Sequence, residues 1–144
     1  MNTGIKALLA LLTCLLFLPA LAQAVPNYAG VWKGPIKLVS NECGFSQEES
    51  ALLKMRVKQV GDLVSFRRKF DGILTIGKAK AQSFTMAISL TFTIDDRSNT
   101  KSFEYRFKNI KDGSANFRFR AFERYTDGVE CEVIYRGRMK RTQK

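Results

Sequence analysis

Apolar and polar side chains alternate with a period of two along most of the chain after residue 25. In the clearest run, Phe84–Ile94, every second residue is a large apolar one, and serine, threonine or alanine fills the positions between. A helix would scatter these apolar side chains around its circumference, whereas a strand places all of them on one face. The run therefore predicts a strand with one buried apolar face.

Seven other segments alternate in the same way and predict seven more strands: 32–38, 53–58, 64–70, 73–81, 103–108, 117–122 and 129–139. Within segment 64–70, Arg68 falls on the apolar face, beside Val64, Phe66 and Phe70. Glycine–aspartate pairs, which suit hairpin turns, separate these segments at 61–62, 71–72, 112–113 and 127–128.

One segment has a helical pattern. In Ser46–Leu53 a serine in the N-cap position is followed three residues later by Glu49. This spacing is typical of a capping box, so we expect one or two turns of helix after the first strand.

Eight antiparallel strands leave two exposed sheet edges unless the sheet closes on itself. Closure into an up-and-down barrel removes both edges, and a β-sandwich is the competing arrangement. We therefore predict an all-β fold, a single antiparallel barrel of about eight strands with one short helical segment.

The N-terminus has the pattern of a secretory signal peptide. Lys6 precedes an apolar run from Ala7 to Leu18, and Ala22-Gln23-Ala24 offers a cleavage site with two small side chains. The run is shorter than the roughly 20 apolar residues that span a bilayer. We expect residues 1–24 to be removed, residues 25–144 to form one domain, and the product to be periplasmic or secreted without a transmembrane segment.

Removal of the leader leaves two cysteines, Cys43 and Cys131. Two cysteines in an exported chain predict one disulfide. Cys43 follows the first predicted strand and Cys131 lies in the last, so the bond would join the strands that must pair when a barrel closes. Closing a loop of this length would stabilise the fold by about 4.5 kcal/mol in the chain-entropy estimate.

Gly30-Val31-Trp32, at the start of the first strand, resembles the Gly-x-Trp signature of lipocalins and related calycin barrels. In that family the tryptophan caps one end of the barrel and an arginine from the last strand packs across it. The resemblance implies that Arg136, Arg138 or Arg141 contacts Trp32. Thr126-Asp127 resembles the second motif of the family, although it lies in the last predicted hairpin and not in the preceding one.

No set of residues suggests catalysis. The chain has no histidine, which excludes Ser-His-Asp triads, Cys-His dyads and histidine-ligated zinc. Glu130 and Glu132 share a strand face, but that face is the outer one, where pairing with Arg118 or Arg120 is expected. We therefore expect a protein that is not an enzyme and has no cofactor and no metal.

The inner face is the first candidate for a binding site. Barrels of eight strands either fill their interior with side chains or hold one small ligand. Aromatic residues would fill much of this interior, whereas small residues at 77, 79, 81, 115, 121 and 137 would leave a pocket along one wall. A cavity beside Ser46–Leu53 would favour a ligand. The candidate ligand-binding residues are Trp32, Phe66, Phe84, Phe92, Phe103, Phe107 and Phe117.

The outer face is the second candidate. The net charge of +11, or +10 after loss of Lys6 with the leader, exceeds what solubility requires. The candidate surface for an anionic partner comprises Arg118, Arg120, Arg136 and Arg138. The sequence disfavours nucleic acid, because the aromatic side chains point inward and cannot stack on bases.

These patterns predict an exported, non-catalytic binding protein whose barrel holds a small apolar or amphiphilic ligand. The alternative is a cationic surface module that docks on anionic envelope components, with peripheral membrane contact, or on an acidic protein partner, for example as an inhibitor.

Overall fold

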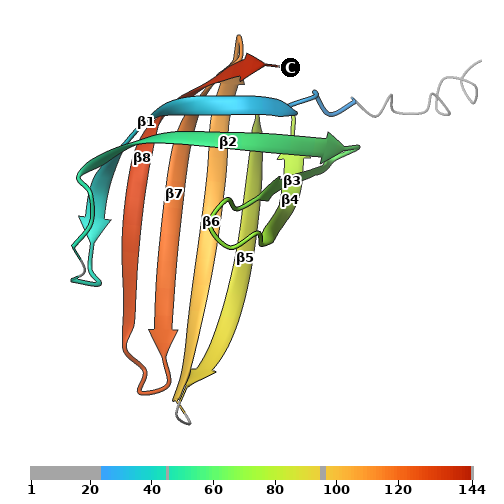
Figure 1. Cartoon of the computed structure of the whole chain (residues 1–144). Helices are drawn as coiled ribbons and strands as arrows, with labels where there is room; N and C mark the ends of the chain where they lie inside the picture. Colours follow the sequence, from blue (N-terminus) through green and yellow to red (C-terminus); the bar gives the residue numbers. More distant parts are fainter. Residues whose placement is uncertain (1–23, 45, 95–96, 144) are drawn as a thin grey trace, which may run out of the picture.

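A computed structural model describes residues 24–44, 46–94 and 97–143, and the predicted signal peptide lies outside this range except for Ala24. Eight strands form a closed antiparallel barrel in sequence order (Figure 1): β1 (Gly30–Asn41), β2 (Ser50–Val60), β3 (Leu63–Arg67), β4 (Leu74–Lys80), β5 (Ser83–Ile94), β6 (Arg97–Lys111), β7 (Ser114–Tyr125) and β8 (Glu130–Gln143). Within these residues there is no helix of the length and apolarity needed to cross a membrane. The predicted all-β barrel is confirmed, and the β-sandwich is not formed.

The barrel closes where β1 pairs with β8. A Cβ atom on Gly34 would lie 2.1 Å from the carbonyl oxygen of Arg138, and one on Gly137 would lie 2.1 Å from that of Pro35. Glycine at both positions lets the two backbones approach this closely. The glycines of the closing strands therefore make room for a neighbouring strand.

A pocket beside the six small residues was one of two alternatives for the interior, and the structure does not place a cavity there. A Cβ atom on Gly77 would lie 1.6 Å from the carbonyl oxygen of Thr85, so neighbouring backbone occupies that space. Ala79 and Ala115 are buried in the core. None of the six residues lines the cavities described below.

The predicted disulfide is present and joins the closing strands. Cys43 and Cys131 are 88 residues apart in sequence, and their Cα atoms are 5.0 Å apart. Asn41 and Val133, close to the two cysteines, are paired in the β1–β8 register. The bond therefore fixes the end of the seam at which β1 finishes and β8 begins.

The tight turns follow the sequence pattern. Asp112 and Gly113 have φ angles of 50° and 70°, as expected for the two central residues of a type I′ hairpin.

The predicted helix over Ser46–Leu53 is wrong. Residues 46–49 have no regular structure, and β2 begins at Ser50. Ser50 and Ala51 pair with Lys37 and Ile36 of β1, and the backbone carbonyl of Glu49 accepts a hydrogen bond from the amide of Leu38. Barrel closure thus outweighs the local capping preference, because a helix here would leave this part of β1 without a partner.

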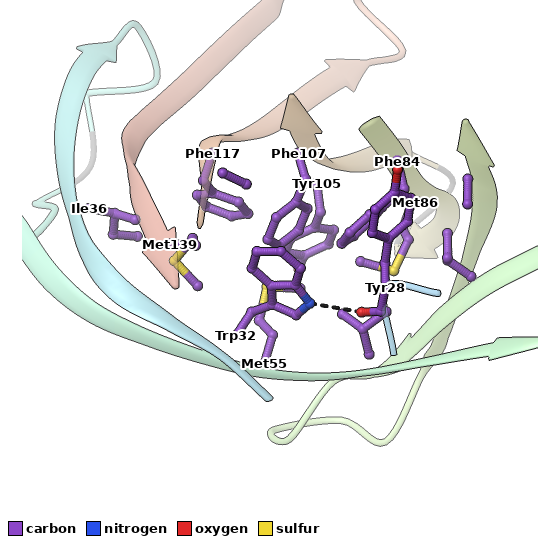
Figure 2. Close-up of a cluster of buried hydrophobic side chains, with 14 of the residues drawn as sticks. Tyr28, Trp32, Ile36, Met55, Phe84, Met86, Tyr105, Phe107, Phe117 and Met139 are labelled. Atoms are coloured by element: carbon purple, nitrogen blue, oxygen red, sulfur yellow. Dashed lines mark hydrogen bonds between the residues drawn. The ribbon is translucent and has the colours of Figure 1, made fainter. Parts of the chain in front are cut away.

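The core fills one end of the barrel. Trp32 lies at its centre with ring centroids 5.9 Å from Phe84 and 5.2 Å from Phe107, and its indole nitrogen donates a hydrogen bond to the carbonyl of Tyr28 at 3.0 Å (Figure 2). Edge-to-face contacts of this kind add to the stabilisation from burial. The largest fully buried side chains are Trp32, Phe84, Phe107, Met55, Met86 and Met139.

The strands continue beyond this core. Figure 1 shows β5 to β8 running well past the short strands β3 and β4. On β5, Phe84 is 1% exposed, whereas Phe92 is 44% and Ile94 is 70% exposed. The apolar face of β5 is therefore packed at one end and uncovered at the other.

Candidate functional site

A groove of about 1350 Å³ lies at the uncovered end of the barrel. Its walls come from the end of β5, the start of β6, the beginning of the β7–β8 turn, and the β3–β4 loop (residues 68–73). The lining side chains are Arg68, Phe70, Asp71, Ile73, Leu90, Phe92, Ile94, Arg97, Ser98, Asn99, Lys101, Phe103, Tyr125, Thr126 and Asp127. The groove is open to solvent along one side, and its volume exceeds the roughly 300–1,000 Å³ typical of small-molecule sites.

One wall of the groove is apolar because the alternation of β5 continues past the core. Leu90, Phe92 and Ile94 lie on the face that also carries Phe84. Phe103 of β6 contributes the apolar surface nearest the barrel interior, where its ring stacks on Phe119 with centroids 6.3 Å apart. This wall can accept an apolar chain or ring.

A buried charge lies at the inner end of the groove. Arg68 is 3% exposed, and its guanidinium carbon lies 4.4 Å from the ring centroid of Phe70 and 4.2 Å from that of Phe103. Its Nε donates to Oδ1 of Asp71 at 3.1 Å, and its Nη2 donates to Oδ2 of the same carboxylate. The hydrogen bonds from Arg68 hold the pKa of Asp71 below its ordinary value.

The mouth of the groove carries a second ion pair. Lys101 Nζ lies 2.8 Å from Oε1 of Glu123, and Tyr125 donates a hydrogen bond to Oε2 at 2.8 Å. Partial burial raises the pKa of Glu123, but the hydrogen bonds from Lys101 and Tyr125 outweigh it, and the pKa lies below its ordinary value. The positive charge of Lys101 is therefore largely matched within the protein.

A smaller cavity of about 280 Å³ lies beside the segment that precedes β2. Gln47, Glu48, Ala51, Leu53, Ile36, Tyr105, Phe119 and Tyr135 line it. Burial raises the pKa of Tyr105 to about 12, although the nearby Arg68 opposes this shift. Tyr105 therefore lines this cavity and also lies close enough to Arg68, at the inner end of the groove, for the charge of Arg68 to affect the pKa of Tyr105.

The seven predicted ligand-binding aromatics divide into two groups. Trp32, Phe84, Phe107 and Phe117 belong to the packed core, and Phe66 packs against Tyr105 with ring centroids 5.1 Å apart. Phe92 and Phe103 line the groove.

Sequence reasoning missed the polar end of the groove. Arg68 could have been found, because it is the charged residue that breaks the alternation of its segment. Phe70, predicted to face inward, is 78% exposed, because β3 ends at Arg67 and Phe70 lies in the loop.

The four predicted surface arginines differ in their partners. Arg118 of β7 is directly opposite Arg136 of β8, and Arg136 is directly opposite Lys37 of β1. These three side chains form no ion pair with a described acidic residue, and we call them the basic row. Arg120, in contrast, pairs with Glu132 at 2.5 Å, and Arg138 donates a hydrogen bond to the hydroxyl of Ser114 at 2.9 Å.

The pairing expected for the two glutamates is confirmed for Glu132, whose partner is Arg120. Glu130 pairs with Arg124 at 2.5 Å. Both carboxylates are therefore engaged in outer ion pairs. In the part of the chain that the structure describes, no cluster of three or more His, Cys, Asp or Glu side chains could hold a metal ion.

Of the three candidate partners of Trp32, Arg141 contacts it. Its guanidinium carbon lies 5.9 Å from the centroid of the Trp32 ring, and the two residues are paired in the β1–β8 register. Comparisons of the chain with protein-family models, with curated proteins and with solved structures find no match.

Proposed function

We propose that this chain is an exported, non-catalytic binding protein that holds an apolar or amphiphilic ligand in the groove. The observation that carries the proposal is the apolar face of β5, which leaves the core at Leu90 and lines a groove of about 1350 Å³. Exposed apolar surface of this kind is unfavourable in water and marks binding sites. A ligand that covers Phe92 and Ile94 would remove the unfavourable exposure of these two side chains to water.

Two further observations support parts of this proposal. The disulfide and the N-terminal leader pattern support export to an oxidising compartment. The contact between Arg141 and Trp32, next to Gly30-Val31, supports a barrel of calycin form. In that arrangement the tryptophan end is closed and the ligand enters from the opposite end.

The experiment is a titration of the protein with an environment-sensitive apolar fluorophore. Ile94 and Ile76 provide a matched pair, because both are exposed isoleucines, at 70% and 50%, and Ile94 lines the groove whereas Ile76 does not. We expect Ile94→Ser to weaken binding by about tenfold through lost apolar contact. Ile76→Ser should leave the affinity unchanged.

Binding in the groove should also be nearly insensitive to salt, because apolar contact is not screened by ions. Equal losses in the two serine variants would mean that the fluorophore binds to exposed apolar surface in general. Absence of saturable binding would contradict the proposal.

A second candidate function rests on the basic row. Like charges placed directly opposite one another destabilise a sheet, and Lys37, Arg136 and Arg118 occupy three neighbouring strands in this way. The Nε atom of Arg118 is also buried without a hydrogen-bond partner. A negatively charged membrane surface would offset the repulsion between these like charges, so the basic row supports peripheral docking on anionic lipid.

Vesicles of phosphatidylglycerol and phosphatidylcholine test this second candidate. Each basic side chain near an anionic surface contributes about 1 kcal/mol. Arg118→Glu combined with Arg136→Glu should therefore weaken binding by at least about thirtyfold. Arg120→Glu is the control, because Glu132 already neutralises Arg120. If the control and the double variant lose the same affinity, the basic row has no special role.

A further inference from the structure

We propose that Arg68 receives the polar end of the ligand, and that the ligand is a carboxylate at the end of an apolar chain. This inference rests on the proposed function, because it assigns the chemistry of the groove that the function requires. It names a residue and a ligand class that neither the strand pattern nor the barrel fold supplies.

Arg68 is a buried charge at the inner end of the groove. It follows the last residue of β3 and points into the barrel, where it lines the inner end of the groove and is 3% exposed. The rings of Phe70 and Phe103 lie 4.4 Å and 4.2 Å from its guanidinium carbon. A charged group is rarely buried to this extent unless it is paired, and Asp71 pairs with only one edge of the guanidinium.

The guanidinium of Arg68 has an incomplete set of hydrogen bonds. Asp71 accepts from Nε and from Nη2 of Arg68, which accounts for one edge of the guanidinium. The remaining nitrogen, Nη1, is buried and has no hydrogen-bond partner of ordinary geometry in the described residues, although the hydroxyl of Tyr105 interacts with Arg68 closely enough for Arg68 to lower the pKa of Tyr105. Because a guanidinium nitrogen can only donate, the missing partner must be an acceptor. An acceptor carried by the ligand would complete the set.

The charges already present in the groove limit the charge of that acceptor. Hydrogen bonds between a guanidinium and a carboxylate are about twice as strong as neutral ones. Asp71 already offsets one positive charge, which disfavours a dianionic group such as a phosphate monoester. Besides Arg68 and Asp71, the charged side chains lining the groove are Arg97, Lys101 and Asp127, and Glu123 neutralises Lys101. Since these charges balance, a carboxylate with one negative charge is accommodated more readily than a group with two.

An apolar surface leads away from Arg68. Leu90, Phe92 and Ile94 line the groove at alternate positions of β5. At about 3.3 Å per residue, the stretch from Leu90 to Ile94 is about 13 Å long. An extended alkyl chain whose carboxylate contacts Nη1 would lie along this wall and cover the apolar side chains that the core leaves exposed.

The test compares dodecanoate with dodecanol by isothermal titration calorimetry on the full-length mature protein. The two ligands share their chain and differ in their polar end. We expect dodecanoate to bind about ten- to a hundredfold more tightly, which is the range for a hydrogen bond to a charged group. Equal affinities would leave the groove proposal standing and overturn the role of Arg68. If neither ligand binds, the proposed function itself fails.

Two variants then test whether Arg68 causes the preference for dodecanoate over dodecanol. Arg68→Met keeps an unbranched side chain between the two rings but removes the donors, and we expect the preference for dodecanoate to disappear. Lys69→Met is the matched control, because Lys69 lies next to Arg68, is exposed and does not line the groove, and the preference should remain. Retention of the preference in Arg68→Met, or its loss in Lys69→Met, would overturn the assignment. The comparison of ligands on the unmodified protein decides the question even if Arg68→Met does not fold.

Discussion

The closed end of the barrel and the open end share strands β5 to β8, but the interior is packed with side chains at the closed end and uncovered at the open end. At the closed end, β1 and β2 cross β5 to β8, and Trp32, Phe84 and Phe107 fill the space between them (Figure 1; Figure 2). At the open end, β5 and β6 extend past β3 and β4, and the β3–β4 loop is the part that reaches over them. Apolar faces become core only where another element covers them.

The two ends therefore contribute differently to stability and binding. Side chains at the closed end are interlocked, so replacing one leaves a cavity. Side chains at the open end already face solvent. Replacing one of them should therefore change the free energy of unfolding little, but should lower the affinity for a ligand that contacts this surface.

Phe107→Ala should lower the free energy of unfolding by about 3–5 kcal/mol. Phe107 is fully buried and stacks on Phe84 with ring centroids 4.2 Å apart. Phe92→Ala is the matched change at the open end and should cost less than about 1 kcal/mol, because Phe92 is 44% exposed. Urea unfolding of both variants measures the difference. Similar losses would mean that the open end is packed as tightly as the closed one.

Cys131→Ala should lower the free energy of unfolding by about 2–5 kcal/mol, because the unfolded chain gains the freedom of an 88-residue loop. Cys43→Ala should have the same effect, and combining the two should add almost nothing. Unfolding in urea with and without a reductant measures this. A reductant should destabilise the native protein and leave the double variant unchanged.

Tyr105 should make stability depend on pH above pH 10. Burial raises its pKa from 10.0 to about 12, so the unfolded chain loses the proton at lower pH than the folded one. The stabilisation is complete below about pH 10 and is lost as pH rises through about 12, amounting to about 2–3 kcal/mol. Tyr105→Phe should remove this part of the alkaline loss, as measured by unfolding at several pH values. An unchanged alkaline profile in Tyr105→Phe would contradict the prediction.

Arg136→Glu should raise the free energy of unfolding by about 0.2–1 kcal/mol. The new carboxylate would lie opposite Lys37 and Arg118, and would replace repulsion across two strand pairs with attraction. Arg120→Glu should have the opposite sign, because it breaks the pair with Glu132. Thermal unfolding at low ionic strength resolves the two effects. A loss of stability in Arg136→Glu would show that repulsion within the basic row does not destabilise the fold.

The strands, their inner faces and the disulfide could be predicted because they depend on local pattern. Alternation places Phe84 and Phe92 on the same face whatever lies opposite, and an exported chain with Cys43 and Cys131 has one pair to form. The helix over Ser46–Leu53 was predicted wrongly for the converse reason. A local capping pattern does not include the hydrogen bonds that β1 offers to Ser50 and Ala51.

The candidate site could be predicted only in part. The sequence places Phe92 and Phe103 inside the barrel, and both line the groove. It also marks Arg68 as an exception to the alternation, but not what surrounds it. The loop brings Asp71 to one edge of the guanidinium, and Phe103 lies 35 positions further along the chain.

By itself the sequence determined which side chains share a face, where the chain turns and which strands the disulfide joins, because these properties follow from a two-residue period and from backbone preferences. The tertiary structure alone decided which half of each apolar face is packed. That depends on how far the paired strands extend past one another and on what crosses them. The same alternation on β5 therefore yields core at Phe84 and groove at Phe92, and the buried charge of Arg68 lies between them.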